Sequence, residues 1–284
     1  MTRVRALVFV LIPFIMMSCK QQKEQNVPQS DVPVLKKVDI DYRMIALKDS
    51  IKKVLSGLDS LQKTIVFTVN RVDAQNMVKL DTVIIPANLN EHLYQYLPYP
   101  FEVPYLKDID KIIFFSYPAQ AFGAYKNGKL VYTGPTSMGR KADKTPTGLF
   151  YTNWKAEKTT STFNDEWELK WNFNIENDSG VGFHEYAMPG YPASHSCLRL
   201  TEKDAKYMYE WADEWELKGT DSVVAKGTPV VVFGSYPFGG PKPWFQLSSN
   251  SKALDISPGE LQQLVTPFLS DILAAQAKRA EISQ

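Results

Sequence analysis

The stretch Pro189-Gly190-Tyr191-Pro192-Ala193-Ser194-His195-Ser196-Cys197-Leu198-Arg199-Leu200 holds one of the two cysteines and one of the three histidines of this 284-residue chain. Another histidine, His184, lies a short way before it. A cysteine with nearby histidines is the minimum equipment for nucleophilic acyl transfer: the thiolate attacks, an imidazole moves the proton and backbone amides hold the oxyanion. The sequence therefore predicts a nucleophile at Cys197.

The local pattern around Cys197 predicts an activated thiol. If residues 194–200 are extended, the side chains of His195, Cys197 and Arg199 share one face. A positive neighbour lowers a thiol pKa, and a helix beginning near Leu200 would bring its positive end to the same place. Two alternatives are a buried, inert thiol and a zinc site formed by His184, His195 and Cys197. The short His-x-Cys spacing and the missing fourth Cys or His ligand disfavour zinc.

Composition limits the class of protein. The chain is 44% hydrophobic and 22% charged, which is typical of a globular protein with one larger domain and a smaller appendage. Its formal net charge is +1 and it has no basic stripe. Nucleic acid is therefore not an expected partner.

The N-terminus predicts export. Arg3 and Arg5 precede an apolar stretch, residues 6–17, that is shorter than the ~20 residues needed to span a bilayer. The stretch ends in Met16-Met17-Ser18-Cys19, which resembles a bacterial lipobox, so residues 1–19 are expected to be a lipoprotein signal peptide with Cys19 lipidated. The alternative is an uncleaved signal anchor. Either way we expect an exported, membrane-anchored protein facing the periplasm, in which Cys197 has no disulfide partner.

The following segments predict a tether and a small N-terminal region. Residues 20–38 lack periodicity and indicate a flexible tether. Residues 39–107 are expected to form a helix and a small subdomain: apolar residues recur at helical spacing over 40–61, for packing on the main domain or, alternatively, for a coiled coil. Residues 64–86 contain an apolar run expected as a strand and a closing strand. They weakly resemble a LysM-type glycan-binding module; a simple packing subdomain is the alternative.

Residues 108–234 are expected to form the main domain, mainly β with flanking helices (an α+β fold). Strands are predicted at 112–117, 119–125, 129–133, 149–151 and 228–233, with a tight hairpin at Asn127-Gly128. A helix is predicted over 201–218. An aromatic group, Trp154, Phe163, Trp167, Trp171 and Phe173, is expected either as a lid over a substrate channel or as a loop with its own core. In residues 235–284, Ser257 should cap a C-terminal helix that Pro267 kinks.

Several motifs in a fixed order give a specific resemblance. Gly182-Phe183-His184, followed by the stretch that ends in Ser194-His195-Ser196-Cys197-Leu198-Arg199, resembles the active-site signature of the L,D-transpeptidase (YkuD-type) family. Upstream, Thr136-Ser137-Met138-Gly139 and Thr145-Pro146-Thr147-Gly148 resemble further elements of that family. The resemblance covers about residues 108–234, and implies a β-sandwich or barrel catalytic domain.

The resemblance implies roles for individual residues. The catalytic residues would be Cys197 as nucleophile, His184 as general base and His195 as a support for the loop and the substrate. The Glu185 carbonyl would orient His184, and the backbone amides from His195 to Cys197, with Ser196 between them, would form the oxyanion hole. The expected substrate-binding or loop-holding residues are Arg199, Ser194 and Tyr191. The family's usual glycine before the nucleophile is Ser196 here. We therefore expect a backbone at Ser196 that an L-residue adopts without strain.

The implied activity is a 3→3 cross-link between peptidoglycan stem peptides, through an acyl-enzyme on Cys197 and without a metal or organic cofactor. An L,D-carboxypeptidase or cross-link hydrolase would use the same acyl-enzyme with water as acceptor. A catalytically dead wall-binding lipoprotein, and an enzyme that attaches an amine-bearing protein to the wall, are further alternatives.

Overall fold

The computed structural model describes residues 36–46, 51–161 and 168–282, and these belong to one unit, Lys36–Gln284. The predicted signal peptide with Cys19 and nearly all of the predicted tether lie outside the described residues, as do Phe163 and Trp167. No described helix is long and apolar enough to cross a membrane.

A five-stranded sheet forms the base of the main domain. Its strand order is β5-β4-β3-β13-β6, with bounds β3 Lys111–Ser116, β4 Ala121–Lys126, β5 Lys129–Pro135, β6 Gly148–Tyr151 and β13 Pro229–Phe233. These runs are rich in β-branched and aromatic residues, which favour strands. The predicted hairpin at Asn127 and Gly128 is confirmed, and both residues have the positive φ (47° and 77°) that a tight type I′ turn requires.

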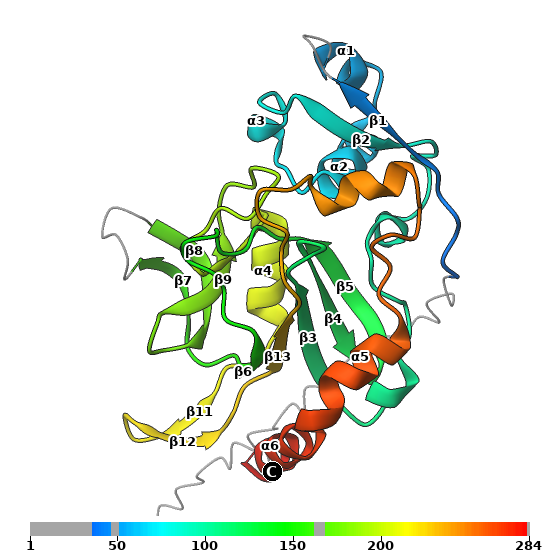
Figure 1. Ribbon diagram of the computed structural model, residues 1–284. Coiled ribbons are helices and arrows are strands. Elements are labelled where there is room, and N and C mark those ends of the chain that lie inside the picture. Colours follow the sequence, from blue (N-terminus) through cyan, green and yellow to red (C-terminus); the bar gives the residue numbers. More distant parts are fainter. Residues whose placement is uncertain (1–35, 47–50, 162–167, 283–284) are drawn as a thin grey trace, which may run out of the picture. The chain divides into compact units, whose positions relative to one another are not determined.

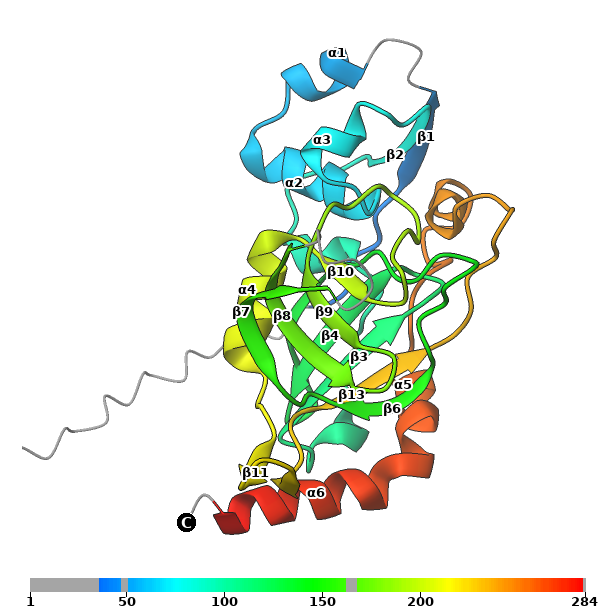
Figure 2. The same ribbon diagram turned by 90° about the vertical axis from the view of Figure 1, so that its left-hand side faces the viewer.

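A second, four-stranded sheet faces the first. It has the order β10-β9-β8-β7, with bounds β7 Lys155–Thr160, β8 Glu168–Glu176, β9 Val181–Glu185 and β10 Leu198–Leu200. The two sheets lie one in front of the other in Figure 2. With the helices around them, they confirm the predicted mainly β fold with flanking helices.

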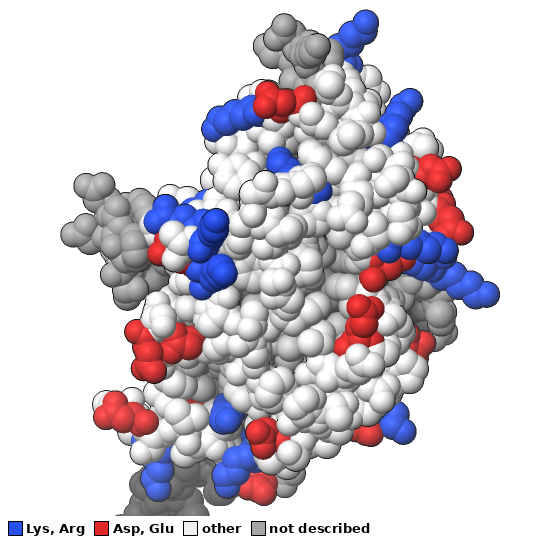
Figure 3. Space-filling model, viewed as in Figure 1, with Lys and Arg blue, Asp and Glu red and all other residues white. Residues whose placement is uncertain are grey.

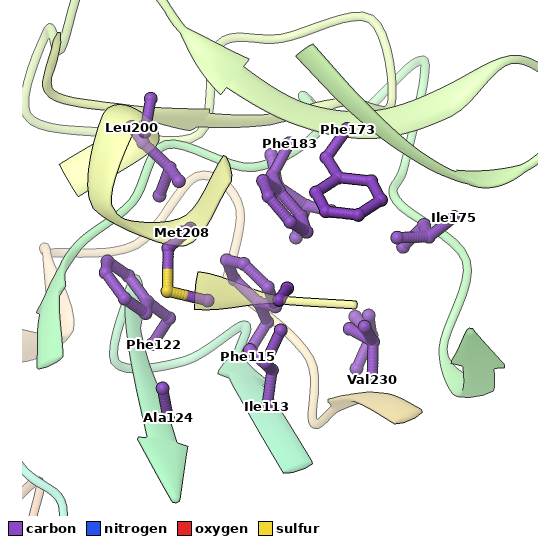
Figure 4. Close-up of a cluster of buried hydrophobic side chains, with 14 of the residues drawn as sticks. Ile113, Phe115, Phe122, Ala124, Phe173, Ile175, Phe183, Leu200, Met208 and Val230 are labelled. Atoms are coloured by element: carbon purple, nitrogen blue, oxygen red, sulfur yellow. The ribbon is translucent and has the colours of Figure 1, made fainter. Parts of the chain in front are cut away.

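The main core lies between the two sheets. In Figure 4 the side chains of Ile113, Phe115 and Val230 point from the five-stranded sheet toward Phe173 and Phe183 of the other sheet. Each of these residues is completely buried. Strand alternation then sends the intervening residues of β8, β9 and β10 to the opposite, outer face, and this is where the polar residues of the site are found.

Helix α4, Glu202–Trp211, packs on β8 and β9 (Figure 1). Its predicted cap, Thr201, is confirmed, but the prediction that the helix continues to residue 218 is wrong. The backbone of Asp213 is held instead by hydrogen bonds with Thr152 and Thr228. The rest of the predicted helix forms β11, Glu216–Lys218, which pairs with β12, Ser222–Ala225.

The N-terminal module, which we define as residues 39–86, differs most from expectation. The elements are β1 Tyr42–Ala46, α1 Ile51–Ser56, α2 Ser60–Val69, α3 Ala74–Met77 and β2 Thr82–Pro86. The helix predicted over 40–61 is confirmed only for α1 and the start of α2 and is wrong at 42–46, which form β1. The strand predicted from Thr64 is wrong, because that segment lies in α2, and the closing strand is confirmed as β2. A capping box between Asp59 and Gln62 starts a helix at Ser60, and β1 pairs antiparallel with β2. Glycan binding by this module stays a prediction.

The C-terminal segment covers the outer face of the five-stranded sheet. Its elements on that face are α5 Pro258–Val265, η4 Thr266–Phe268 and α6 Leu269–Ile282. Leu261, Val265 and Ile272 pack against that face. The preceding η3, Pro243–Ser248, packs on β1 and β2 instead. Two further short helices, η1 Leu93–Tyr96 and η2 Pro104–Leu106, lie between the N-terminal module and β3 in the chain. The capping box of Ser257 with Glu260 is confirmed, and Pro267 lies in the 3-10 turn that interrupts the predicted helix.

Candidate active site

Strands β9 and β10 bring the predicted histidine and cysteine together. They run parallel, with Phe183 opposite Leu198 and His184 opposite Arg199. Cys197 directly precedes β10, so its position is set by the same pairing. Phe183 and Leu198 point into the core, which leaves His184 and Arg199 on the outer face of the sheet.

A cavity of about 460 Å³ lies over this outer face, within the size range of small-molecule and peptide sites. Of the predicted site residues, those lining it are His184, Ser194, His195, Ser196, Cys197 and Arg199. Tyr191 is not among them; its side chain is half exposed outside the cavity. Of the aromatic residues predicted as a lid or a loop core, Trp154 lines the cavity whereas Phe173 belongs to the main core.

His184 is held as a neutral base. Its Nδ1 lies 2.9 Å from the carbonyl oxygen of Glu185, which fixes that nitrogen as the protonated one. The other nitrogen, Nε2, is then the one able to accept a proton. Burial lowers the pKa of His184 to about 4; the hydrogen bond to Glu185 opposes this shift and Arg199 adds to it. The imidazole is therefore uncharged at neutral pH.

Cys197 is a neutral thiol at rest, which corrects the prediction of a lowered pKa. Burial raises its pKa, although the backbone N–H of Gly182 and the guanidinium of Arg199 act in the opposite direction. The sequence indicated the positive neighbour, Arg199, but it did not indicate that the thiol would be buried. The thiol donates to the carbonyl oxygen of Gly180 at 3.7 Å.

The extended conformation predicted for residues 194–200 is only partly present. Strand β10 contains Leu198–Leu200, whereas residues 195–197 form a bend. Helix α4 begins at Glu202, so β10 lies between its N-terminus and Cys197 along the chain. The Thr201 side chain caps that N-terminus by accepting from Asp204 N–H. The structure thus gives no support to the predicted contribution of the helix to the thiol.

Residues of two upstream motifs, 136–139 and 145–148, support the bend at residues 195–197. Thr145 Oγ1 donates to the carbonyl oxygen of Ser196 at 2.8 Å and accepts from Gly139 N–H at 2.9 Å. Ser194 Oγ donates to the carbonyl oxygen of Cys197 at 2.5 Å. Gly139 has no room for a side chain, since a Cβ would lie 2.2 Å from the carbonyl oxygen of Asp143. The two motifs therefore hold the backbone of the loop, residues 194–197, that carries Cys197.

Ser196 adopts a left-handed backbone with φ 73°, which corrects the expectation of an unstrained residue. Its carbonyl oxygen is held by Thr145 and its N–H donates to the carbonyl oxygen of Asp143 at 3.1 Å. That N–H is consequently unavailable to an oxyanion, against the role predicted for it. The N–H of Cys197 has no hydrogen-bond partner in the described part of the chain, and is the donor that remains.

His195 belongs to a charged cluster that the sequence did not reveal. Its Nδ1 lies 3.3 Å from Asp143 Oδ2 and 3.3 Å from Arg140 Nη2, and Arg140 and Asp143 also pair with each other. The only signal for these two residues was their place between Gly139 and Thr145. The cluster ties the His195 ring to the loop that supports Ser196, consistent with a supporting position.

Arg199 forms one side wall of the cavity. Its guanidinium lies 4.5 Å from the centroid of the Tyr186 ring and its Nη1 donates to the carbonyl oxygen of Ala187 at 3.5 Å. Its backbone exchanges two hydrogen bonds with Ser137. Because burial lowers the guanidinium pKa only from a very high value, Arg199 stays positively charged.

Charge elsewhere is scattered. On the face of the molecule in Figure 3, basic and acidic side chains are interspersed. Among residues 36–46, 51–161 and 168–282, no group of three or more His, Cys, Asp or Glu side chains is arranged to hold a metal ion.

The region that contains the candidate site matches a known family. Residues 110–232 match the family model of the L,D-transpeptidase catalytic domain (YkuD), and this range includes both His184 and Cys197. Residues 110–232 are therefore similar to L,D-transpeptidase catalytic domains. No curated protein matches the chain.

Several solved structures that resemble part of this chain are L,D-transpeptidases. An L,D-transpeptidase from Stackebrandtia nassauensis is 23% identical, with a TM-score of 0.37, over 45% of this chain and 57% of that one. One from Mycobacterium smegmatis is 19% identical, with a TM-score of 0.35, over 44% and 59%. One from Enterococcus faecium is 26% identical, with a TM-score of 0.34, over 44% and 50%. The chain thus spans between half and three fifths of the length of these proteins.

Proposed function

We propose that this protein is a peptidoglycan L,D-transpeptidase that works through a Cys197 acyl-enzyme. The sulfur of Cys197 attacks the carbonyl carbon of the third residue of a stem peptide. The amide bond to the terminal D-Ala breaks, D-Ala leaves as an amine, and a thioester forms. An amine of a neighbouring stem then attacks the thioester carbonyl, which restores the thiol and creates a 3→3 cross-link.

The observation that supports this proposal best is the state of His184. Its Nδ1 is committed to the Glu185 carbonyl and its pKa is lowered to about 4 by burial, so the Nε2 lone pair is available at neutral pH. A raised thiol pKa means that Cys197 needs a base at the moment of attack. His184 would take the thiol proton and return it to the leaving D-Ala nitrogen.

The Cys197 N–H and Arg199 would also contribute to this reaction. The unpartnered N–H of Cys197 would stabilise the oxyanion of the tetrahedral intermediate, and one such donor is typically worth ~3 kcal/mol. Arg199, positive and at the cavity wall, would bind a carboxylate of the stem peptide. This reaction requires no metal or organic cofactor.

We also propose that the enzyme is exported and held at the membrane by lipid on Cys19, facing the periplasm. The support is the sequence alone: a basic start, a short apolar stretch and the lipobox-like residues 16–19. Metabolic labelling with a radioactive fatty acid tests this, because Cys19→Ala should abolish the label.

The activity is tested by incubating residues 20–284 with stem-tetrapeptide muropeptides and analysing the products by mass spectrometry. A 3→3 dimer with released D-Ala supports transpeptidation, whereas tripeptide alone identifies a hydrolase. Cys197→Ala and His184→Ala should each form no thioester and no product while remaining folded. Retained activity in Cys197→Ala would refute the mechanism, and unchanged substrate without a thioester on the wild type would favour a wall-binding protein.

A further inference from the structure

Two asparagines of β8 occupy the cavity wall next to the cysteine. Asn172 and Asn174 are 4% and 3% exposed, and both line the cavity that contains Cys197. They are two residues apart on one strand, so their side chains leave the same face. Just before them the β8–β9 register shifts and Trp171 has φ 52°, a bulge of the kind that redirects side chains beside active sites.

The carboxamide of Asn174 is unsatisfied. Its Oδ1 is buried and has no hydrogen-bond partner, and the described residues offer no partner to the Asn172 side chain. Other buried asparagines differ: Asn70 makes three hydrogen bonds with the backbone, and Asn153 bonds to Trp154 N–H and to the side chain of Asn177. A buried acceptor left unpaired destabilises the folded protein. Its presence at a cavity wall therefore points to a partner that arrives with a ligand.

The strand register places this acceptor close to the reacting sulfur. Asn174 pairs with Gly182 across β8 and β9, and Gly182 is the residue whose backbone N–H acts on the Cys197 thiol. Across the outer face of the sheet, β8, β9 and β10 present Asn174, His184 and Arg199 in that order. The carboxamides and the guanidinium thus flank the catalytic histidine on opposite sides.

We propose that the side chains of Asn174 and Asn172 bind the backbone peptide groups of an extended peptide in the cavity, which under the proposed function is the acyl-donor stem. A carboxamide offers an acceptor and two donors, the same groups that a peptide unit carries. In an extended chain, peptide groups facing the same way recur every two residues, about 6.6 Å apart. Asn172 and Asn174 have this spacing. Arg199, beyond His184, then meets the charged end of the same peptide.

The test uses the full chain, with Asn174→Leu as the main variant because leucine has the same branched shape and number of heavy atoms as asparagine and no polar atom. The KM for a stem tetrapeptide should rise about tenfold, as expected for a lost hydrogen bond to a buried peptide group, with kcat changed much less. Asn172→Leu should act in the same direction. Alkylation of Cys197 by iodoacetamide, which needs no peptide contact, should be unchanged.

Thermal unfolding separates binding from a structural role. Asn174→Leu removes an unsatisfied buried oxygen, so its melting temperature should equal or exceed that of the wild type. Asn153→Leu is the matched control: it leaves Trp154 N–H without its acceptor and should lower the melting temperature. A lower melting temperature for Asn174→Leu, or an unchanged KM, would overturn the proposal.

A binding experiment separates this inference from the proposed activity. The Cys197→Ala chain should bind the stem tetrapeptide in a calorimetric titration, and adding Asn174→Leu should weaken binding about tenfold. Binding that depends on Asn174 in a protein that forms no product would uphold the inference and refute the transpeptidase. Turnover with binding indifferent to Asn174, or no binding at all by Cys197→Ala, would refute the inference.

Discussion

Asp73 of the N-terminal module and Met188 of the loop between His184 and Cys197 exchange two hydrogen bonds. The N–H of Asp73 donates to the Met188 carbonyl at 2.9 Å, and the N–H of Met188 donates to Asp73 Oδ2 at 2.7 Å. Met188 is buried and lies between His184 and Cys197 in the chain. The module is thus a structural support for the loop that connects His184 and Cys197, the two residues proposed to be catalytic.

Asp73→Ala should therefore impair catalysis as well as stability. The same carboxylate caps α3 by accepting from Asn76 N–H, so we expect a loss of about 1–2 kcal/mol in the free energy of unfolding. Freed from Asp73, the loop should also place Cys197 less accurately, and the acylation rate should fall at least about tenfold. Stopped-flow acylation and chemical denaturation measure the two effects.

Asp59→Ala is the matched control for Asp73→Ala. Asp59 caps α2 in the same module, and its hydrogen bonds go to Gln62 and Lys63 of α2, away from the loop between His184 and Cys197. It should cost about 1 kcal/mol of stability and leave acylation unchanged. Equal loss of activity in both variants would mean that Asp73 acts only through the fold of the module.

Thiol alkylation should show a raised pKa. Burial disfavours the thiolate of Cys197, so reaction with iodoacetamide should be slow at pH 7 and still be accelerating at pH 9, above the ~8.5 of an ordinary thiol. A pH series of second-order rate constants measures this. A plateau below neutral pH would instead identify a preformed thiolate–imidazolium pair.

Enzymatic acylation should have a different pH dependence. His184 must be neutral to accept the thiol proton, and its pKa is lowered to about 4. The acid limb of kcat/KM should therefore lie near pH 4 rather than near the ~6.5 of an ordinary histidine. Activity that halves near pH 6.5 would contradict the buried, neutral state of His184.

The same lowered pKa makes the stability of the fold pH-dependent. Between pH 6.5 and 4 the unfolded chain binds a proton at His184 that the folded protein does not, so folding weakens as the pH falls through this window. The effect at pH 4 relative to pH 7 is up to about 3 kcal/mol. His184→Gln should lack this component. The difference between the two denaturation series isolates it from the other titrating groups.

Ser196→Gly should relieve backbone strain. At φ 73° a serine costs about 1 kcal/mol more than glycine, so the variant should be more stable by about that amount and keep its activity. Ser249→Gly is the control, because Ser249 has φ −112° and a similar hydroxyl bond to a carbonyl. Destabilisation of Ser196→Gly would show that the Oγ bond to the His195 carbonyl outweighs the strain.

Local signals predicted the elements that local interactions form. The Asn127-Gly128 turn and the caps at Thr201 and Ser257 are set by neighbouring residues. The five strands of the first sheet could be predicted because their own residues favour extended backbone, although β13 pairs with β3 and β6 far along the chain. The helix predicted from the periodicity of residues 40–61 was wrong at 42–46. These residues form β1, whose partner β2 lies far along the chain and pairs with it only in the folded protein. The predicted end of the 201–218 helix was wrong for a similar reason, since Thr152, just after β6, and Thr228, just before β13, are far along the chain from most of that helix or across a turn from it.

Burial explains what sequence reasoning missed in the site. The composition of the cysteine loop suggests an activated thiol, because Arg199 and the histidines are visible in the sequence. The loss of water around Cys197 and His184 is not visible, and it reverses the expected direction of the thiol pKa. Nothing in the sequence indicated that Asn174 belongs to the site, because its buried, unpaired Oδ1 atom is a consequence of the folded structure.

The sequence by itself indicated which residues the proposed chemistry would use, because the chain has few cysteines and histidines and the ordered motifs around Cys197 limit their roles. It also determined the mainly β fold, through strand and turn signals that act over short distances. The tertiary structure alone decided the protonation states, the strained backbone of Ser196 and the support of the loop by Asp73. These depend on desolvation and on contacts between residues far apart in the chain, which appear only after the sheets have packed.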